Sequence, residues 1–223
     1  PLRKIVMAFR GLGKSYITSA YVCWRLLRNP QLKFMVVSAS KQRADDFSQF
    51  TKKIIYEMSI LQHLYPKSTQ RSSNVAFDVG PARADHSPSV KSVGVMGQLT
   101  GSRADEIIAD DVEVPNNSET QGMRDKLSER VKEFDAVLKP GGRVTYLGTP
   151  QTEDSLYNEL PSRGYQIRIW PSRIPAEKDV VLKYNENLAP YIRDMIGRFT
   201  VGTPTDPDRF DEADLMEREA SYG

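Results

Sequence analysis

The sequence predicts an α/β fold in which a mainly parallel sheet is flanked by helices. Short apolar runs alternate along the chain with longer segments whose apolar residues recur at helical spacing, and this pattern is typical of parallel sheets covered by helices. The composition agrees, because 39% of the 223 residues are hydrophobic and 27% are charged, as in folded globular chains.

The segments predicted as strands are short, apolar and bounded by turn residues. In chain order they are 4–9, 34–37, 75–79, 90–96, 106–110, 143–147 and 165–170. The run at 106–110 is strongly apolar and ends in an acidic residue.

Helices are predicted between the strands, and the first two are 14–27 and 41–58. Trp24, Phe47 and Phe50 lie at helical spacing within them and are predicted to be core residues. Cys23 is predicted to be a small buried residue.

A third helix is predicted after Ser118, whose side chain could form a capping box with Gln121. Leu127, Val131 and Phe134 recur at intervals of four and three residues within it. The sequence Pro140-Gly141-Gly142 is predicted to end this helix.

The pattern changes after Pro171. We predict a core unit over residues 1–170 and a small, mostly helical linker subdomain over 171–223, with helices through 188–199 and 211–220. Since the chain does not begin with Met, we interpret it as a domain of a longer protein.

Several classes of protein disagree with the composition. No apolar run approaches the roughly 18 residues that a membrane helix needs, which predicts a soluble intracellular protein. Cys23 is the sole cysteine and the two histidines, His63 and His86, stand apart, so neither a disulfide nor a zinc cluster is expected. Residues 1–60 carry eleven Lys and Arg against three Asp and Glu, a weak indication of a polyanionic partner.

A phosphate-binding loop is predicted between the first strand and the first helix. Its residues are Ala8, Phe9, Arg10, Gly11, Leu12, Gly13, Lys14 and Ser15. Small residues let backbone N–H groups turn toward an anion, the lysine reaches terminal phosphates, and the hydroxyl can bind Mg²⁺ at a helix N-terminus. Ala8 departs from the usual pattern, which has glycine there.

Carboxylates follow the apolar strand at 106–110. A nucleotide loop requires an acid at the end of a second buried strand to hold Mg²⁺, together with a carboxylate that orients the attacking water. Asp110 is the predicted metal ligand, Asp111 the leading catalytic carboxylate, and Glu113 its rival because glutamate reaches further.

These motifs resemble the ATPase domain of the large terminase subunit of short-tailed, podovirus-type bacteriophages. The resemblance is carried by AFRGLGKS, IIADDVEVP and YLGTPQTE, with SVKSVGVMGQLTGSRAD between them, and extends over nearly the whole chain. It implies a RecA-like additional-strand P-loop ATPase that uses ATP and Mg²⁺. In the family, a nuclease domain follows this motor and an adenine-contacting segment precedes it, so both are expected to lie outside the chain.

The resemblance also implies partners and a location. They are double-stranded DNA, the portal protein of the procapsid, the small terminase subunit and further copies of the chain in a ring, in the host cytoplasm and transiently at the portal vertex. By motif, Lys14 and Ser15 take the phosphate and Mg²⁺ roles and Asp110 the Walker B role. Thr149 resembles the coupling motif that senses the γ-phosphate, although a simple turn would also place a threonine there.

Phosphoryl transfer needs positive charge near the developing negative charge. Arg10 lies within the loop and is predicted to supply it in the same chain, as the family does. Arg103 is predicted to enter a neighbouring subunit's site, with Arg124 as a weaker candidate, although Arg103 could equally pair with Asp105 or Glu106 at the surface.

Two other functions remain open at this point. One is a P-loop helicase or translocase of another family, and the other is a nucleotide-binding packaging scaffold without hydrolysis of its own. Replacing Asp111 and Glu113 separately would distinguish a motor from a scaffold.

Overall fold

The computed structural model describes residues 2–149 and 155–222. The strands are β1 (Arg3–Ala8), β2 (Phe34–Ser38), β3 (Ala76–Phe77), β4 (Val90–Gly94), β5 (Ala104–Asp110), β6 (Leu138–Gly148) and β7 (Gln166–Trp170). They form a seven-stranded sheet in the order β3-β4-β2-β5-β6-β1-β7, and each neighbouring pair is parallel except β3 with β4. The predicted α/β class with a mainly parallel sheet is therefore confirmed.

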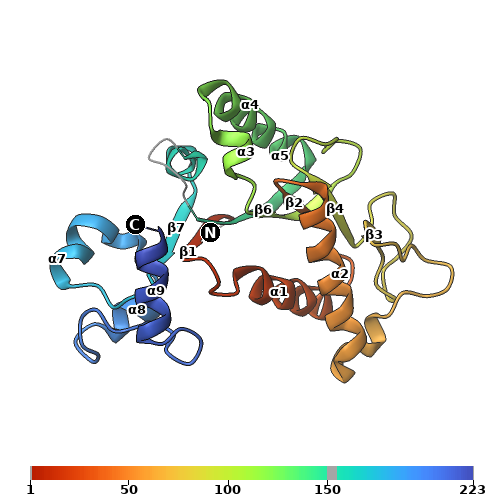
Figure 1. Ribbon diagram of the computed structural model, residues 1–223. Coiled ribbons are helices and arrows are strands. Elements are labelled where there is room, and N and C mark those ends of the chain that lie inside the picture. The colour runs from red at the N-terminus through yellow and green to blue at the C-terminus, as the bar shows by residue number, and fades with distance from the viewer. Residues whose placement is uncertain (1, 150–154, 223) are drawn as a thin grey trace.

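The helices connect these strands and cover both faces of the sheet (Figure 1). The α-helices are α1 (Lys14–Arg28), α2 (Lys41–Glu57), α3 (Pro115–Ser118), α4 (Gln121–Lys132), α5 (Phe134–Val137), α6 (Leu156–Glu159), α7 (Glu177–Asp179), α8 (Pro190–Met195) and α9 (Glu212–Tyr222). Four shorter helical turns are η1 (Ser59–Leu64), η2 (Leu160–Arg163), η3 (Val180–Tyr184) and η4 (Asn185–Asn187). Among the described helices, none combines the length and the apolar character that a membrane span requires.

Alternate residues of each strand enter two different cores, because successive side chains of a strand point to opposite faces. Ile107 of β5 packs in the core beneath α4 and α5, while its neighbour Ile108 packs in the core beneath α1 and α2. A third, smaller apolar cluster lies after β7 and includes Ile174, Leu188 and Ile192.

The buried face of α1 differs from the predicted one. Trp24 is 50% exposed and Ile17 is 68% exposed, so the prediction that Trp24 is a core residue is wrong. The face against the sheet contains the smaller side chains Ser19, Val22 and Cys23, which let the helix approach closely. The Cys23 thiol is buried, and this burial raises its pKa to about 12.

On α2, Phe47 is buried as predicted, while Phe50 is half-buried and packs edge-on against the ring of Tyr16. The core prediction for Phe50 is therefore correct only in part. Ile55 contributes to the same buried face of α2.

Three predicted helix boundaries are also wrong. The helix predicted through 188–199 is shorter, because α8 begins at Pro190 and ends at Met195. Thr120 caps α4 by accepting a hydrogen bond from the Met123 N–H, whereas Ser118 closes α3 and its hydroxyl donates to the Val114 carbonyl. Helix α5 already ends at Val137, so Pro140 lies inside β6, where the register with β5 is interrupted.

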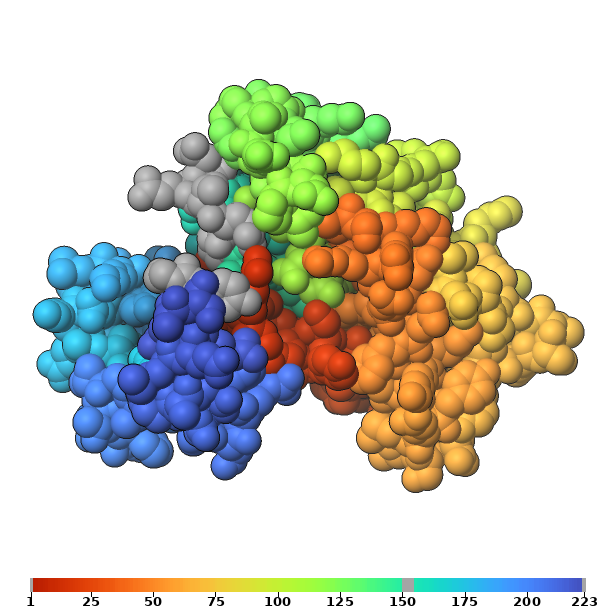
Figure 2. Space-filling view, in the orientation of Figure 1, coloured from red at the N-terminus to blue at the C-terminus, as the bar shows by residue number. Residues whose placement is uncertain are grey.

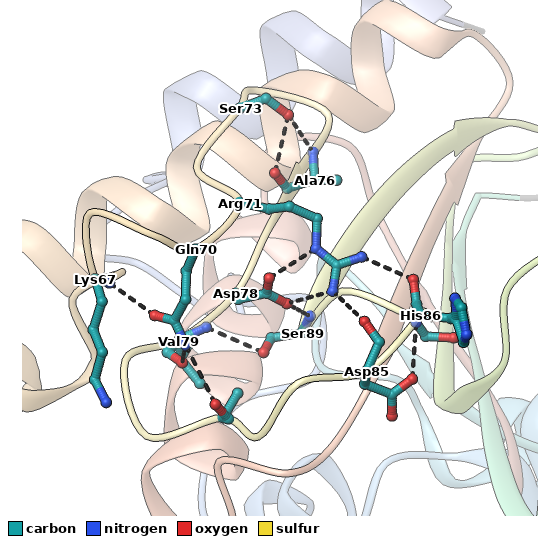
Figure 3. A network of polar contacts seen from close by, with 12 residues as sticks. Lys67, Gln70, Arg71, Ser73, Ala76, Asp78, Val79, Asp85, His86 and Ser89 are labelled. Atoms are coloured by element: carbon teal, nitrogen blue, oxygen red, sulfur yellow. Dashed lines mark hydrogen bonds and ion pairs between the residues drawn. The ribbon is translucent and has the colours of Figure 1, made fainter.

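The long connection between η1 and β4 is held by Arg71 (Figure 3). Its guanidinium binds the Asp78 carboxylate at 2.8 Å and donates to the carbonyls of Asp85 and His86. His86 thus contributes its backbone carbonyl to this cluster. This cluster fixes the loop at the amino ends of the central strands, away from the carboxyl ends.

Candidate functional site

The predicted phosphate-binding loop follows β1 at the carboxyl end of the sheet. Gly11 and Gly13 both have positive φ values, 91° and 89°, which glycine adopts without a steric penalty. Gly13 is the N-cap of α1, so the free N–H groups of the first helical turn and the positive end of the helix dipole lie at this loop. The backbone is therefore suited to hold an anion.

Lys14 and Thr149 meet beside this loop. The Lys14 ammonium donates to the Ala8 carbonyl at 2.9 Å and to the Thr149 hydroxyl at 3.4 Å. The hydroxyl of Thr149 in turn donates to the same carbonyl at 3.0 Å. Burial lowers the pKa of Lys14, although the nearby charges of Asp111 and Asp110 oppose this shift. The remainder of the Gly148-Thr149-Pro150 motif, Pro150, lies outside the described residues.

Ser15 and Asp110 lie together although 95 residues separate them. The Ser15 hydroxyl is 2.8 and 3.0 Å from the two carboxylate oxygens of Asp110. Asp110 ends β5 and is 9% exposed, and burial raises its pKa to about 6 despite the hydrogen bond from Ser15. A hydroxyl and a carboxylate are hard oxygen donors, so this pair fits Mg²⁺. Within the described residues, no group of three or more His, Cys, Asp or Glu side chains could hold a metal ion.

Asp111 and Glu113 have different surroundings. Asp111 has a φ of 44°, unusual for a residue other than glycine, and its half-buried side chain lines the pocket beside the loop. Glu113 is 2% exposed, and one of its oxygens accepts hydrogen bonds from the Ser155 hydroxyl at 2.9 Å and the Leu156 N–H at 2.7 Å. Burial raises the pKa of Glu113. Glu113 therefore ties the end of β5 to the start of α6.

The three candidate arginines do not gather at one place. Arg10 is exposed in the loop and lines the pocket. Arg103 directly precedes β5, so it lies at the amino end of this strand. At about 3.3 Å per residue, this end is roughly 20 Å from the carboxyl end, where the pocket lies. Its guanidinium donates to the Ala136 carbonyl. Arg124 lies on α4 and donates to the Ser118 carbonyl and to Gln121.

The acidic partners considered for Arg103 bind other cations. Asp105 forms an ion pair with Lys139 at 2.9 Å, and buried Glu106 forms one with Arg25 at 3.0 Å.

The pocket has a volume of about 950 Å³ and draws on six separate parts of the chain, which include Met96 and Thr149. Figure 2 shows a hollow surrounded by the P-loop segment, α2, the green segment that follows β5, and the C-terminal segment. Sequence reasoning missed Arg43 in the first turn of α2, although the convergence of parallel strands at their carboxyl ends could have indicated it. It also missed Arg209, which no local pattern connects with a loop some 200 residues earlier.

The fold is similar to that of a solved phage large terminase. The crystal structure of the HK97 bacteriophage large terminase superposes with a TM-score of 0.50 at 12% identity, covering 84% of this chain and 34% of that one. The N-terminal domain of the DNA packaging ATPase from bacteriophage phi29 gives a TM-score of 0.48 at 15% identity, covering 75% and 86%.

Sequence comparison gives the family. Residues 5–140 match the family model described as terminase large subunit, T4likevirus-type, N-terminal. The chain is 57% identical over 225 residues to the large terminase subunit of Enterobacteria phage T3, and the match covers 98% of this chain and 38% of that protein. The chain therefore belongs to the terminase large subunit family and spans about two fifths of the length of this relative.

Proposed function

We propose that the chain is the ATP-hydrolysing motor domain of a terminase large subunit, which drives double-stranded DNA through the portal into a procapsid. The observation that carries the proposal is the approach of Ser15 to Asp110, because it joins the end of the phosphate-binding loop to an acid on a second buried strand. Family membership supports the packaging role.

In this proposal the loop binds the phosphates of ATP through its backbone N–H groups and Lys14. Ser15 and Asp110 would hold Mg²⁺, which would neutralise negative charge on the phosphates when bound. Arg10 adds positive charge from the same chain, opposite the charge that develops in the transition state.

Asp111 is the carboxylate that orients the attacking water and accepts its proton. Both Asp111 and Glu113 line the pocket, but Glu113 already accepts two hydrogen bonds, from Ser155 and Leu156, at the start of α6. This assignment favours the shorter of the two carboxylates considered from the sequence.

Thr149 is proposed to couple hydrolysis to movement. Its hydroxyl lies within hydrogen-bonding distance of Lys14, which contacts the terminal phosphates in the proposed mechanism. Loss of the γ-phosphate would change this contact and move the end of β6. The division into a core over 1–170 and a linker subdomain over 171–223 is part of the same proposal, supported by the separate apolar cluster after β7.

The partners follow from family membership and are proposals too. They are the portal protein, the small terminase subunit and other copies of the chain in a ring, assembled in the host cytoplasm at the portal vertex. Arg103 lies away from the site of its own chain, so we assign it to the site of a neighbour in this ring.

Steady-state ATP turnover with Mg²⁺ tests the proposal, with Lys14→Ala as the site variant. We expect wild-type turnover and its abolition in Lys14→Ala with an unchanged circular dichroism spectrum. Retained turnover in a folded Lys14→Ala chain contradicts the site, and a wild-type chain that binds ATP without hydrolysing it indicates a scaffold. Strand separation by the active chain would instead favour a helicase of another family.

A further inference from the structure

The C-terminal segment packs directly on the phosphate-binding loop. The Phe210 side chain is 7% exposed, and its ring meets the Phe9 ring edge-on with 5.4 Å between centroids. A Cβ atom at Gly11 would lie 2.7 Å from the Phe210 ring, so only glycine leaves room for this contact. The loop and Phe210 are thus shaped to fit each other.

The neighbouring residue, Arg209, lies at the rim of the nucleotide pocket. A Cβ atom at Gly13 would lie 3.2 Å from Arg209 Nη1, which places the guanidinium beside the N-terminus of α1. Arg209 lines the same pocket as Lys14 and Ser15. Among residues 2–149 and 155–222, no acidic side chain forms an ion pair with Arg209. Its charge is therefore available to an anion in the pocket.

The segment that carries Arg209 is fixed at both ends. On one side, the buried Thr205 hydroxyl accepts a hydrogen bond from the Trp170 indole at 3.1 Å and donates to the Pro171 carbonyl at 2.8 Å. On the other side, Arg173 binds Glu212 at 2.8 Å and Glu219 at 2.7 Å and so holds α9. The place of Arg209 beside the loop follows from this packing.

The charges around the pocket favour a polyanion. Lys14 is joined there by three arginines, and the acidic side chains lining the pocket are Asp111 and Glu113. An arginine suits phosphate because its planar guanidinium can donate two parallel hydrogen bonds.

We propose that Arg209 binds the terminal phosphates of the nucleotide held by the loop of the same chain. The inference rests on the proposed function, and it adds a second element of the chain to the nucleotide site. The segment after β7 then contacts the nucleotide itself, so its position depends on how many phosphates are present.

The test measures equilibrium binding of a fluorescent, non-hydrolysable ATP analogue, and of ADP and AMP by competition, to the 223-residue chain. Arg209→Ala and Arg209→Gln are compared with Arg198→Ala, a matched loss of one exposed arginine from the same subdomain. We expect both Arg209 variants to bind the ATP analogue about tenfold more weakly, since a hydrogen bond to a charged group contributes on the order of a tenfold change in affinity. ADP should be affected less, and AMP and the Arg198 variant should be unaffected.

The outcomes separate this inference from the proposed function. Unchanged binding of the ATP analogue in Arg209→Ala, with a normal wild-type affinity, overturns the inference alone. Equally weaker binding of ATP, ADP and AMP also overturns it, because a general disturbance of the loop would then be the cause. A loss of affinity in Arg209→Ala that Arg209→Gln does not share overturns it too. A wild-type chain that binds no nucleotide overturns the proposed function and this inference together.

Discussion

The hydroxyl of Ser15, at the start of α1, contacts both carboxylate oxygens of Asp110, at the end of β5. Strands β1 and β5 are not neighbours, because β6 lies between them. The contact therefore depends on the strand order of the whole sheet, and it brings two hard oxygen donors to one point.

This contact predicts a metal-dependent defect in Asp110→Asn. An amide is a weaker ligand for Mg²⁺ than a carboxylate, so we expect ATP turnover to fall by more than about 100-fold, with higher Mg²⁺ restoring part of it. The measurement is turnover against Mg²⁺ concentration. Asp194→Asn, which removes an exposed carboxylate far along the chain, is the control and should behave as wild type. Full activity of Asp110→Asn would remove Asp110 from the site.

Asp111→Asn and Glu113→Gln should separate the two candidate bases. We expect Asp111→Asn to reduce turnover by about 10²–10⁴-fold, the usual contribution of general base catalysis, with ATP binding kept. Glu113→Gln should stay within about tenfold of wild type, because glutamine can still accept the hydrogen bonds from Ser155 and Leu156. The reverse order of effects would assign the role to Glu113.

Glu113 also predicts a pH dependence of stability. Burial raises the pKa of its carboxyl in the folded chain above the value in the unfolded chain, so the folded state binds more protons in this range. The free energy of unfolding must then fall as the pH rises from about 4.5 through the folded pKa. In Glu113→Gln this contribution is absent, so the stability of the variant relative to wild type should increase across that interval. Denaturant unfolding at a series of pH values measures this, and a constant difference would contradict the burial of an ionisable Glu113.

Gly148, at the end of β6, predicts a steric defect. A Cβ atom there would overlap the buried Tyr157 ring, so we expect Gly148→Ala to lower the free energy of unfolding by about 1–3 kcal/mol, as overpacked cores do. Gly122→Ala is the matched control, because nothing lies within 4 Å of its Cβ position and alanine is favoured in helix α4. Denaturant midpoints compare the two, and equal stabilities would mean that the Tyr157 ring moves aside.

Arg103 predicts a dependence on protein concentration. Since it precedes the amino end of β5, away from its own chain's pocket, any contribution that it makes to turnover would have to be in a neighbour's site. Turnover per chain should rise with wild-type concentration, and this rise should be lost in Arg103→Ala. Constant turnover across the concentration range would place the full catalytic set in one chain and favour Arg10.

The sequence predicted the features of the fold that depend on nearby residues. The strands and the loop from Ala8 to Ser15 follow from short apolar runs and from glycine spacing, both of which are local patterns. The orientation of α1 was not predictable in this way, because Ile17 and Trp24 have helical spacing but the sheet selects a face of smaller side chains. Propensity and periodicity are overridden by packing at this point.

The site was predictable to a similar extent. The geometry of the motifs that contain Lys14, Ser15 and Asp110 is known, and parallel strands bring these residues together at their carboxyl ends. Arg209 has no motif, and its place depends on contacts of Thr205, Phe210 and Arg173 that form only in the folded chain.

The environment of Cys23 has a practical consequence for the design of spectroscopic probes. A thiol that is 2% exposed and whose pKa is raised to about 12 contains almost no reactive thiolate at neutral pH. Since the chain has no other cysteine, a pair of dyes or spin labels can be attached to two introduced cysteines, one on α9 and one on α2, without first removing the natural one. The distance between the C-terminal segment and the P-loop core could then be followed in an otherwise wild-type chain as nucleotide is added.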